Sequence, residues 1–223
     1  MPLYSIADFT VEIIPRHGEV AELLSPYAVC DGTPLFSICL SDEEIARELL
    51  PDITPWQAES AGICRRLAER LLPHGGYLFH AAVIELDGVG YAFTAKSGVG
   101  KTTHIAMWMK KYGATAINGD KPFLRVRDGR IYAYGTPWCG KENWHKNTAV
   151  PLGGLCFLAR GEENAITRLT PADALSLLLP QLYLAPQALD FAERFVTEVP
   201  AYRLYATRSW AAAELSYETM KVK

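Results

Sequence analysis

Residues 94–104, TAKSGVGKTTH, combine glycines, a lysine and hydroxyl side chains at a spacing suited to holding phosphate groups. Gly98 and Gly100 permit a tight loop that turns backbone N–H groups inward, because glycine tolerates dihedral angles that other residues avoid. These N–H groups and the N-terminus of a following helix form a positive concavity for an anion. In such a P-loop, Lys101 reaches the terminal phosphates of a nucleotide and the hydroxyl of Thr102 ligates Mg²⁺.

The segments on either side of the loop fit this interpretation. The apolar run 91–94 predicts a strand, and residues 103–113 predict a helix that ends at Gly113. Strand, glycine-rich loop and helix is the order that a phosphate-binding loop requires. A glycine loop that only turns the chain is the alternative.

Asp120 is the candidate acid for phosphoryl transfer, which needs a carboxylate close to the phosphates. It follows the apolar run 115–117, which predicts a short strand next to the P-loop. As a general base Asp120 would accept a hydroxyl proton, and as a metal ligand it would hold Mg²⁺ directly or through water. The alternative is a turn aspartate in the sequence Asn118-Gly119-Asp120, which also suits a loop.

His80 lies in residues 77–86, YLFHAAVIEL, which predict a strand. The following Asp87-Gly88 pair predicts a two-residue hairpin, so this strand is expected to run antiparallel to the strand that feeds the P-loop. Such pairing differs from a doubly wound nucleotide fold, where the feeding strand has parallel neighbours. His80 is therefore either a core residue or a side chain near the phosphates.

Residues 136–148, TPWCGKENWHKNT, gather varied side chains in one predicted loop. Trp138, Lys141, Glu142 and His145 are its candidate binding residues, because loops with this range of chemistry often line binding sites. A solvated loop anchored by its two tryptophans is the alternative.

The composition restricts the class of protein. The chain has 223 residues, of which 49% are apolar and 21% charged, so a full core can form. A net charge of −3 argues against general nucleic-acid binding. No apolar run approaches the roughly 20 residues of a membrane span, and the N-terminus lacks the pattern of a secretory signal. Five cysteines without metal-like spacing indicate reduced thiols in a cytoplasmic protein.

Two parts are expected along the chain. Residues 1–75 predict a small N-terminal α/β unit, with capping boxes that begin helices after Ser41 and Thr54. Residues 76–223 carry the P-loop and alternate strands, a second Asp-Gly hairpin at 128–129 and further helices. The chain shows no linker between the two parts.

The stretch FHAAVIELDGVGYAFTAKSGVGKTTH, followed by GATAINGDKPFL, resembles the catalytic domain of the HPr kinase/phosphorylase family. The shared features are a histidine-bearing strand, an Asp-Gly hairpin, a GxSGxGKS-type P-loop and an acidic position after the next strand. The similarity covers residues 78–124 well and the remainder more loosely, through PLGGLCFLAR and RLTPADALSLLLPQLY. Residues 1–75 resemble the short leading segments of stand-alone relatives.

The resemblance implies an α/β fold with the mixed-sheet P-loop kinase architecture of the HPr kinase/phosphoenolpyruvate carboxykinase type. It also implies ATP and Mg²⁺ as cofactors, a catalytic Asp120 that shares the metal with Thr102, and an active-site His80. The residues that would bind the nucleotide phosphates are Ser97, Gly98, Val99, Gly100, Lys101, Thr102 and Thr103.

Two features depart from the family pattern. Gly119 replaces the first acid of the usual Asp-Asp pair, and no segment matches the glycine-rich signature loop used toward a protein substrate. Stand-alone relatives include kinases of small molecules, such as free serine, and of peptide hydroxyls. The expected activity is transfer of the ATP γ-phosphate to such a hydroxyl, recognised by Trp138–Lys146. Because related enzymes often assemble, a homo-oligomer is a further expectation.

Two other functions stay open. A nucleotide-binding sensor without catalysis is suggested by the missing acid at Gly119. A carboxykinase-like reaction on an oxo-acid is the enzymatic rival, although the chain is shorter than those enzymes and lacks their additional metal-binding motifs.

Overall fold

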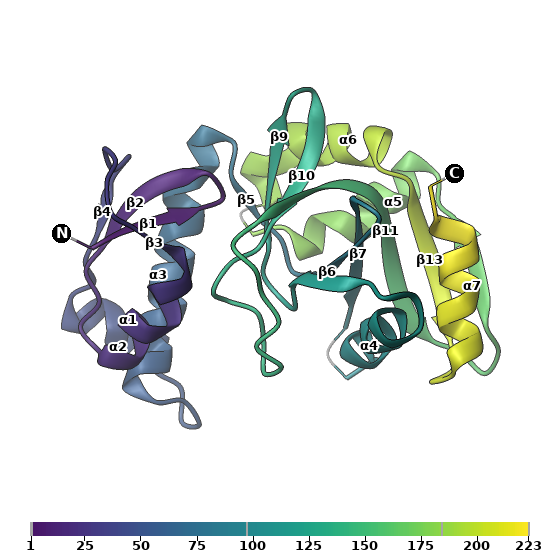
Figure 1. The fold of residues 1–223 in the computed structure, drawn as a ribbon, viewed down its shortest axis with the longest axis horizontal. Coiled ribbons are helices and arrows are strands. Elements are labelled where there is room, and N and C mark those ends of the chain that lie inside the picture. The colour runs from purple at the N-terminus through teal and green to yellow at the C-terminus, as the bar shows by residue number, and fades with distance from the viewer. Residues whose placement is uncertain (1, 97, 184, 223) are drawn as a thin grey trace. The chain divides into compact units, whose positions relative to one another are not determined.

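The structure is a computed structural model that describes residues 2–96, 98–183 and 185–222. Contacts within the chain divide it into two compact units, residues 1–76 and 77–223 (Figure 1). Helices and strands occur in both units, so the chain is a mixed α/β protein. No helix in the described part of the chain is both long and apolar enough to cross a membrane.

The first unit is a four-stranded sheet with three helices. Its strands pair in the order β3-β1-β2-β4. The strands are β1 (Leu3–Ile6), β2 (Phe9–Ile13), β3 (Ala28–Val29) and β4 (Ser37–Ile38). The helices are α1 (Gly18–Leu24), α2 (Asp42–Glu48) and α3 (Pro55–Leu71). The two predicted capping boxes are confirmed: Ser41 caps α2 and Thr54 caps α3, each with its reciprocal side-chain partner.

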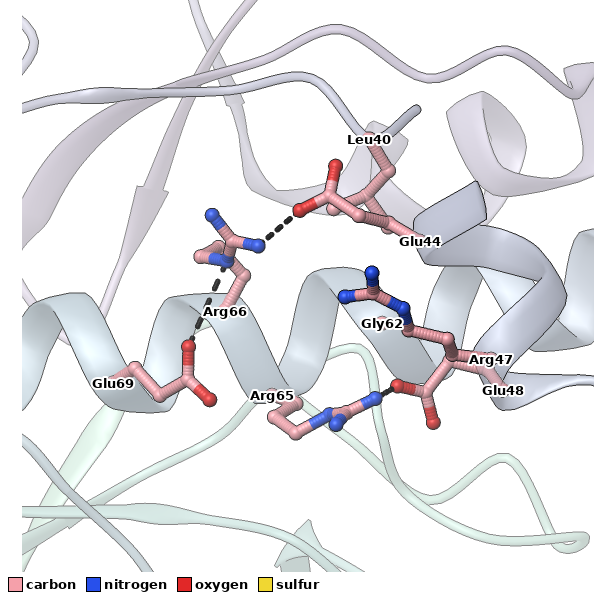
Figure 2. Close-up of a pocket in the computed structure, with 8 residues that line it drawn as sticks. All are labelled: Leu40, Glu44, Arg47, Glu48, Gly62, Arg65, Arg66 and Glu69. Carbon is pink, nitrogen blue, oxygen red and sulfur yellow. Dashed lines mark hydrogen bonds and ion pairs between the residues drawn. The ribbon is translucent and has the colours of Figure 1, made fainter. Parts of the chain in front are cut away.

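Ion pairs join α2 to α3. Figure 2 shows Arg66 between Glu44 of α2 and Glu69 of its own helix, while Arg65 pairs with Glu48. Gly62 allows this close packing, because a Cβ there would lie 2.7 Å from the Leu40 side chain. The small charged hollow between the helices is therefore occupied by acids and bases that pair with one another.

The second unit is built on a nine-stranded mixed sheet. Seven strands follow the order β5-β9-β10-β11-β7-β6-β8, and β13 continues the sheet from β11 and pairs with β12. The strands are β5 (Tyr77–Leu78), β6 (Ala82–Leu86), β7 (Val89–Ala95), β8 (Thr115–Asn118), β9 (Phe123–Arg127), β10 (Arg130–Tyr134), β11 (Ala149–Arg160), β12 (Ala165–Arg168) and β13 (Ala201–Ala206). The predicted hairpins at 87–88 and 128–129 are both confirmed, with the left-handed backbone angles that such turns require.

The strand β7, which leads into the P-loop, has two kinds of neighbour. It is antiparallel to β6, as the Asp-Gly signal predicts, and parallel to β11, which in turn is parallel to β13. The carboxyl ends of three parallel strands, β7, β11 and β13, consequently meet at one edge of the sheet.

In the described part of the second unit, four α-helices accompany the sheet. Figure 1 shows where they lie. They are α4 (Lys101–Tyr112), α5 (Pro171–Leu178), α6 (Leu189–Glu198) and α7 (Trp210–Met220). Trp108 of α4 is fully buried in a core with Phe93 of β7 and Met220 of α7, which fixes α4 and α7 against the sheet. Phe79 packs on Phe195 of α6 instead, away from that core.

Candidate functional site

The P-loop joins the end of β7 to the beginning of α4. Gly98 has a φ of +76° and Gly100 a φ of +118°, so both positions need the conformational freedom of glycine. Gly100 caps α4, whose first turn contains no acidic residue and begins with Lys101. This helix end can therefore attract an anion. Ser97, which the sequence places in the same loop, lies outside the described residues.

Asp120 is the centre of a group of charged side chains. Its carboxylate lies 3.2 Å from Lys101 Nζ, 2.9 Å from Lys121 Nζ and 3.3 Å from His80 Nε2. Burial alone would raise the pKa of Asp120, but the hydrogen bond from His80 and the charges of Lys121 and Lys101 outweigh it. The pKa is held well below its usual value, so Asp120 is a carboxylate throughout the physiological range.

A turn after β8 positions Asp120. The side-chain oxygen of Asn118, which is fully buried, accepts hydrogen bonds from the backbone N–H groups of Asp120 and Lys121, at 2.9 and 2.7 Å. The amide group of Asn118 donates to the Thr136 carbonyl oxygen at 2.9 Å. Asp120 is therefore both a turn residue and a residue of the candidate site, because the turn fixes its carboxylate in place.

β8, the strand that ends before Asp120, is not adjacent to β7, the strand that leads into the P-loop. β6 lies between β8 and β7. Asp120 still meets Lys101 because β6 begins only at Ala82, and the Ala81 N–H donates to the Asp120 carbonyl oxygen at 3.0 Å. Because β6 begins only at Ala82, it does not separate the ends of β7 and β8 where the P-loop and Asp120 follow.

The structure also corrects the strand predicted around His80. The predicted strand 77–86 is broken into β5 and β6, and His80 lies in the break with 46% of its side chain exposed. Its N–H donates to the Gln181 carbonyl oxygen, 2.8 Å away. His80 is therefore neither a strand residue nor a core residue, and its ring points to Asp120.

These residues line a cavity of about 390 Å³, which we name the P-loop cavity. Its lining consists of Ala95, Lys96, Gly98, Gly100, Lys101 and Thr102 from the P-loop segment, His80, Gly119, Asp120, Gly140, Lys141, Glu142 and Arg208. The predicted residues Lys141 and Glu142 are thus brought to the site. Trp138 and His145, from the same loop, are absent from the described lining, as are Val99 and Thr103, which line a narrower neighbouring hollow.

The loop with Lys141 and Glu142 is held tightly against Gly119. A Cβ at Gly119 would lie 2.3 Å from the Cys139 carbonyl oxygen, and the Lys121 N–H donates to the Trp138 carbonyl oxygen at 3.0 Å. The position at which the resemblance leads one to expect a second acid is therefore filled by backbone of residues 138–140. Burial raises the pKa of the Cys139 thiol to about 11, which leaves it protonated and unsuited to nucleophilic chemistry.

Two arginines at the P-loop were missed by the sequence analysis. Arg160 Nη2 donates to the Gly98 carbonyl oxygen at 2.6 Å, and Arg208 Nη2 approaches the same oxygen at 3.4 Å. Arg160 ends β11 and Arg208 follows β13, so both come from the sheet edge at which β7 ends. Arg160 and Arg208 could be identified only from their position at the carboxyl ends of parallel strands, and this position is known only once the strand order is known.

The described residues fit a nucleotide with a divalent cation. Lys96, Lys101, Lys141 and Arg208 make the lining predominantly positive, as a polyphosphate requires. In the described parts of the chain, no cluster of three or more His, Cys, Asp or Glu side chains forms a dedicated metal site. Mg²⁺ in phosphate-transfer sites characteristically needs only one or two protein ligands beside the phosphates. Thr102 and Asp120 are the residues that would hold it.

Comparison with known proteins gives little beyond this geometry. No protein-family model and no curated protein matches the chain. Among solved structures, one that aligns with it is the Hpr(Ser) kinase/phosphatase from Coxiella burnetii, with 12% sequence identity and a TM-score of 0.41. The alignment covers 64% of this chain and 87% of that one.

Proposed function

We propose that the protein is an ATP-dependent kinase that transfers the γ-phosphate to a hydroxyl group. The observation that carries this proposal is the convergence of Lys101, Asp120 and His80 within one P-loop cavity. A glycine-rich loop and a helix N-terminus supply the phosphate cradle, and an ionised carboxylate lies beside the lysine. Phosphoryl transfer needs these groups in this proximity.

Each side chain has a defined task. Lys101 leaves Asp120 for the terminal phosphate when the nucleotide binds, because the Asp120 carboxylate and the phosphate oxygens compete for the same ammonium group. Asp120 then accepts the hydrogen bond of the acceptor hydroxyl and takes its proton. His80 donates to Asp120 and holds the orientation of the carboxylate. Bound Mg²⁺ supplies the positive charge that neutralises the phosphate oxygens in the transition state.

The transfer step is an in-line displacement at the γ-phosphorus of ATP. The acceptor oxygen bonds to the γ-phosphorus while the bond from this phosphorus to the bridging oxygen of ADP breaks. ADP leaves with the bonding electron pair, and the acceptor proton passes to Asp120. Catalysis of this step consists mainly of positioning the reactants and stabilising charge. Asp120 suits this task because it stays ionised and can orient the acceptor hydroxyl.

A nucleotide-binding sensor is the second candidate, because Gly119 leaves one carboxylate fewer than the resembling family uses. ADP release separates the two functions. The assay combines Mg-ATP with a pool of free amino acids, sugars, alcohols and a seryl peptide, with Lys101→Ala as control. A kinase gives ADP release that depends on one acceptor and is lost in the variant. ATP binding without release above the level of the variant supports the sensor and contradicts the kinase.

A further inference from the structure

A second cavity, of about 190 Å³, also has His80 in its wall. Its walls are the segments 78–80 and 180–183, together with Lys121, and we name it the side cavity. His80 lines both the side cavity and the P-loop cavity. A molecule in the side cavity would thus lie one side chain away from the site where the phosphates are expected.

The walls of the side cavity are fixed by backbone pairing. Phe79 and Leu182 form an antiparallel bridge, flanked by hydrogen bonds from His80 N–H to the Gln181 carbonyl oxygen and from Tyr183 N–H to the Leu78 carbonyl oxygen, at 2.8 and 3.0 Å. This pairing makes the cavity a preformed feature of the fold, as small-molecule sites usually are.

Thr94 connects the side cavity to the P-loop strand. Its hydroxyl oxygen lies 2.9 Å from the His80 carbonyl oxygen and 3.0 Å from Gln181 Oε1, and it precedes the last residue of β7. The side cavity and the P-loop therefore share one rigid support. Such a support holds two reactants in a fixed relative position.

The side cavity has a charged end, and the rest of its wall is mostly apolar, with Gln181 and Tyr183 as the other polar wall residues. His80 and Lys121 both contact Asp120, at 3.3 and 2.9 Å, and so mark the polar end. Leu78, Pro180 and Leu182 provide apolar surface, and Phe79 is fully buried behind them. The described wall residues include no carboxylate, so an ammonium group would lose its hydration there without gaining an anionic partner.

We propose that the side cavity binds the phosphate acceptor and that this acceptor is a small alcohol with a compact, largely apolar body. The proposal rests on the kinase function proposed above. The hydroxyl lies at the polar end and reaches past His80 and Lys121, the two side chains that contact Asp120, into the P-loop cavity. There its oxygen bonds to the γ-phosphorus of ATP and its proton passes to Asp120, while ADP leaves with the electron pair. The apolar body fills the space between Leu78, Pro180 and Leu182. A volume below the roughly 300–1,000 Å³ of typical ligand pockets restricts the acceptor to a compact molecule.

The assignment differs from the expectation that residues 138–146 recognise the acceptor. In the described structure, this loop contributes Gly140, Lys141 and Glu142 to the P-loop cavity and no residue to the side cavity. Lys141 is a cation in the cavity that contains the P-loop, where its charge favours the nucleotide over an uncharged alcohol.

The first test compares acceptors of opposite polarity. The full chain is incubated with Mg-ATP and 3-methylbutan-1-ol, 2-phenylethanol, glycerol or L-serine at equal concentrations, and ADP release and phosphorylated product are measured. The two apolar alcohols are expected to raise ADP release at least about tenfold above the basal rate, whereas glycerol and L-serine raise it less than about twofold.

The second test fills the side cavity. Pro180 is an exposed wall residue, so Pro180→Trp narrows the cavity without altering the P-loop. The KM for the better alcohol is expected to rise about tenfold or more, because the apolar body no longer fits. Glu193→Trp, an exposed position on α6 outside both cavities, is the matched control and is expected to leave this KM unchanged. Unchanged Mg-ADP affinity shows that each variant is folded, and Pro180→Phe replaces the first variant if that affinity is lost.

The outcomes separate this proposal from the kinase function. Equal stimulation by glycerol or L-serine, no stimulation by either apolar alcohol, or an unchanged alcohol KM in Pro180→Trp overturns the side-cavity assignment. Phosphoryl transfer to another acceptor in the same assay would leave the kinase function intact. Failure of the wild-type protein to bind Mg-ATP would instead overturn the kinase function itself.

Discussion

Lys101 and Asp120 form an ion pair, with 3.2 Å between Nζ and Oδ1, although β6 separates the strands that lead to them. The pair connects the group expected to neutralise the phosphates with the group expected to receive the acceptor proton. Lys121 and His80 contact the same carboxylate, so Asp120 remains held when Lys101 leaves it for a nucleotide.

Asp120→Asn should separate binding from transfer. The substitution removes the proton acceptor and releases Lys101 from its ion pair, while asparagine keeps a carbonyl oxygen that can still ligate Mg²⁺. The dissociation constant for Mg-ATP is therefore expected to stay within about threefold of the wild-type value. The rate of acceptor-dependent ADP release should fall about 10²–10⁴-fold, as loss of a general base does. Isothermal titration with Mg-ATP and steady-state ADP release measure the two quantities. Full activity in the variant would contradict the role of Asp120.

Arg208→Ala should weaken the binding of ATP more than that of ADP. Arg208 lines the P-loop cavity near the Gly98 carbonyl oxygen, where a guanidinium group can reach the terminal phosphate. Loss of one charge-assisted hydrogen bond predicts a decrease in ATP affinity of about 10- to 100-fold. Arg160→Ala is the matched control, because Arg160 contacts the same carbonyl oxygen without lining the cavity. Equal effects of the two variants on ATP and ADP would refute a phosphate contact by Arg208.

Gly119→Ala should destabilise the protein, because a Cβ would lie 2.3 Å from the Cys139 carbonyl oxygen and this backbone must move. Overpacking of this kind costs about 1–3 kcal/mol and lowers Tm by several degrees. Gly18→Ala is the comparison, since a Cβ there has open space and needs no unusual φ. Thermal unfolding followed by circular dichroism gives the result. An unchanged Tm in Gly119→Ala would show that residues 138–140 yield easily, and that a second acid could be accommodated.

The free energy of unfolding should depend on pH through His104. His104 is buried and contacts Ser216 Oγ at 2.9 Å, and burial lowers its pKa from 6.5 to about 4. The unfolded chain binds this proton at pH values at which the native state does not. The contribution of the neutral ring is therefore complete above pH 6.5 and is lost as the pH falls toward 4, by up to about 1.4 kcal/mol per pH unit.

His104→Gln provides the measurement, because glutamine can also hydrogen-bond to Ser216 and does not titrate. Denaturant unfolding of both proteins between pH 4 and 7.5 should give a steeper loss of stability in the wild type. Parallel pH profiles would mean that His104 is accessible to protons in the native state.

Local signals in the sequence predicted much of the fold. The capping boxes at Ser41 and Thr54 and the hairpins at 87–88 and 128–129 are confirmed, because each depends on residues within one turn. The same holds for the glycine that ends α4 at residue 113. The strand β12 was missed, since its four residues are almost entirely exposed and carry no alternation of apolar and polar positions.

Long-range pairing explains what the sequence could not indicate. The break after β5 arises because residues 78–80 pair with 181–183, about a hundred positions away. Arg208 reaches the P-loop only because β13 is parallel to β11, and β11 to β7. No pattern within a short window contains such information, so neither the side cavity nor the position of Arg208 in the P-loop cavity was predicted.

Titration of Mg-ATP into the wild-type protein and into Lys101→Ala tests the central claim most directly. Lys101 is the cation of the P-loop and is released from Asp120 by the incoming phosphate, so its removal should weaken Mg-ATP binding by about 10- to 100-fold or more. This result would place the phosphates in the P-loop cavity. No Mg-ATP binding by the wild type, or equal affinity in Lys101→Ala, would contradict a nucleotide site at the P-loop.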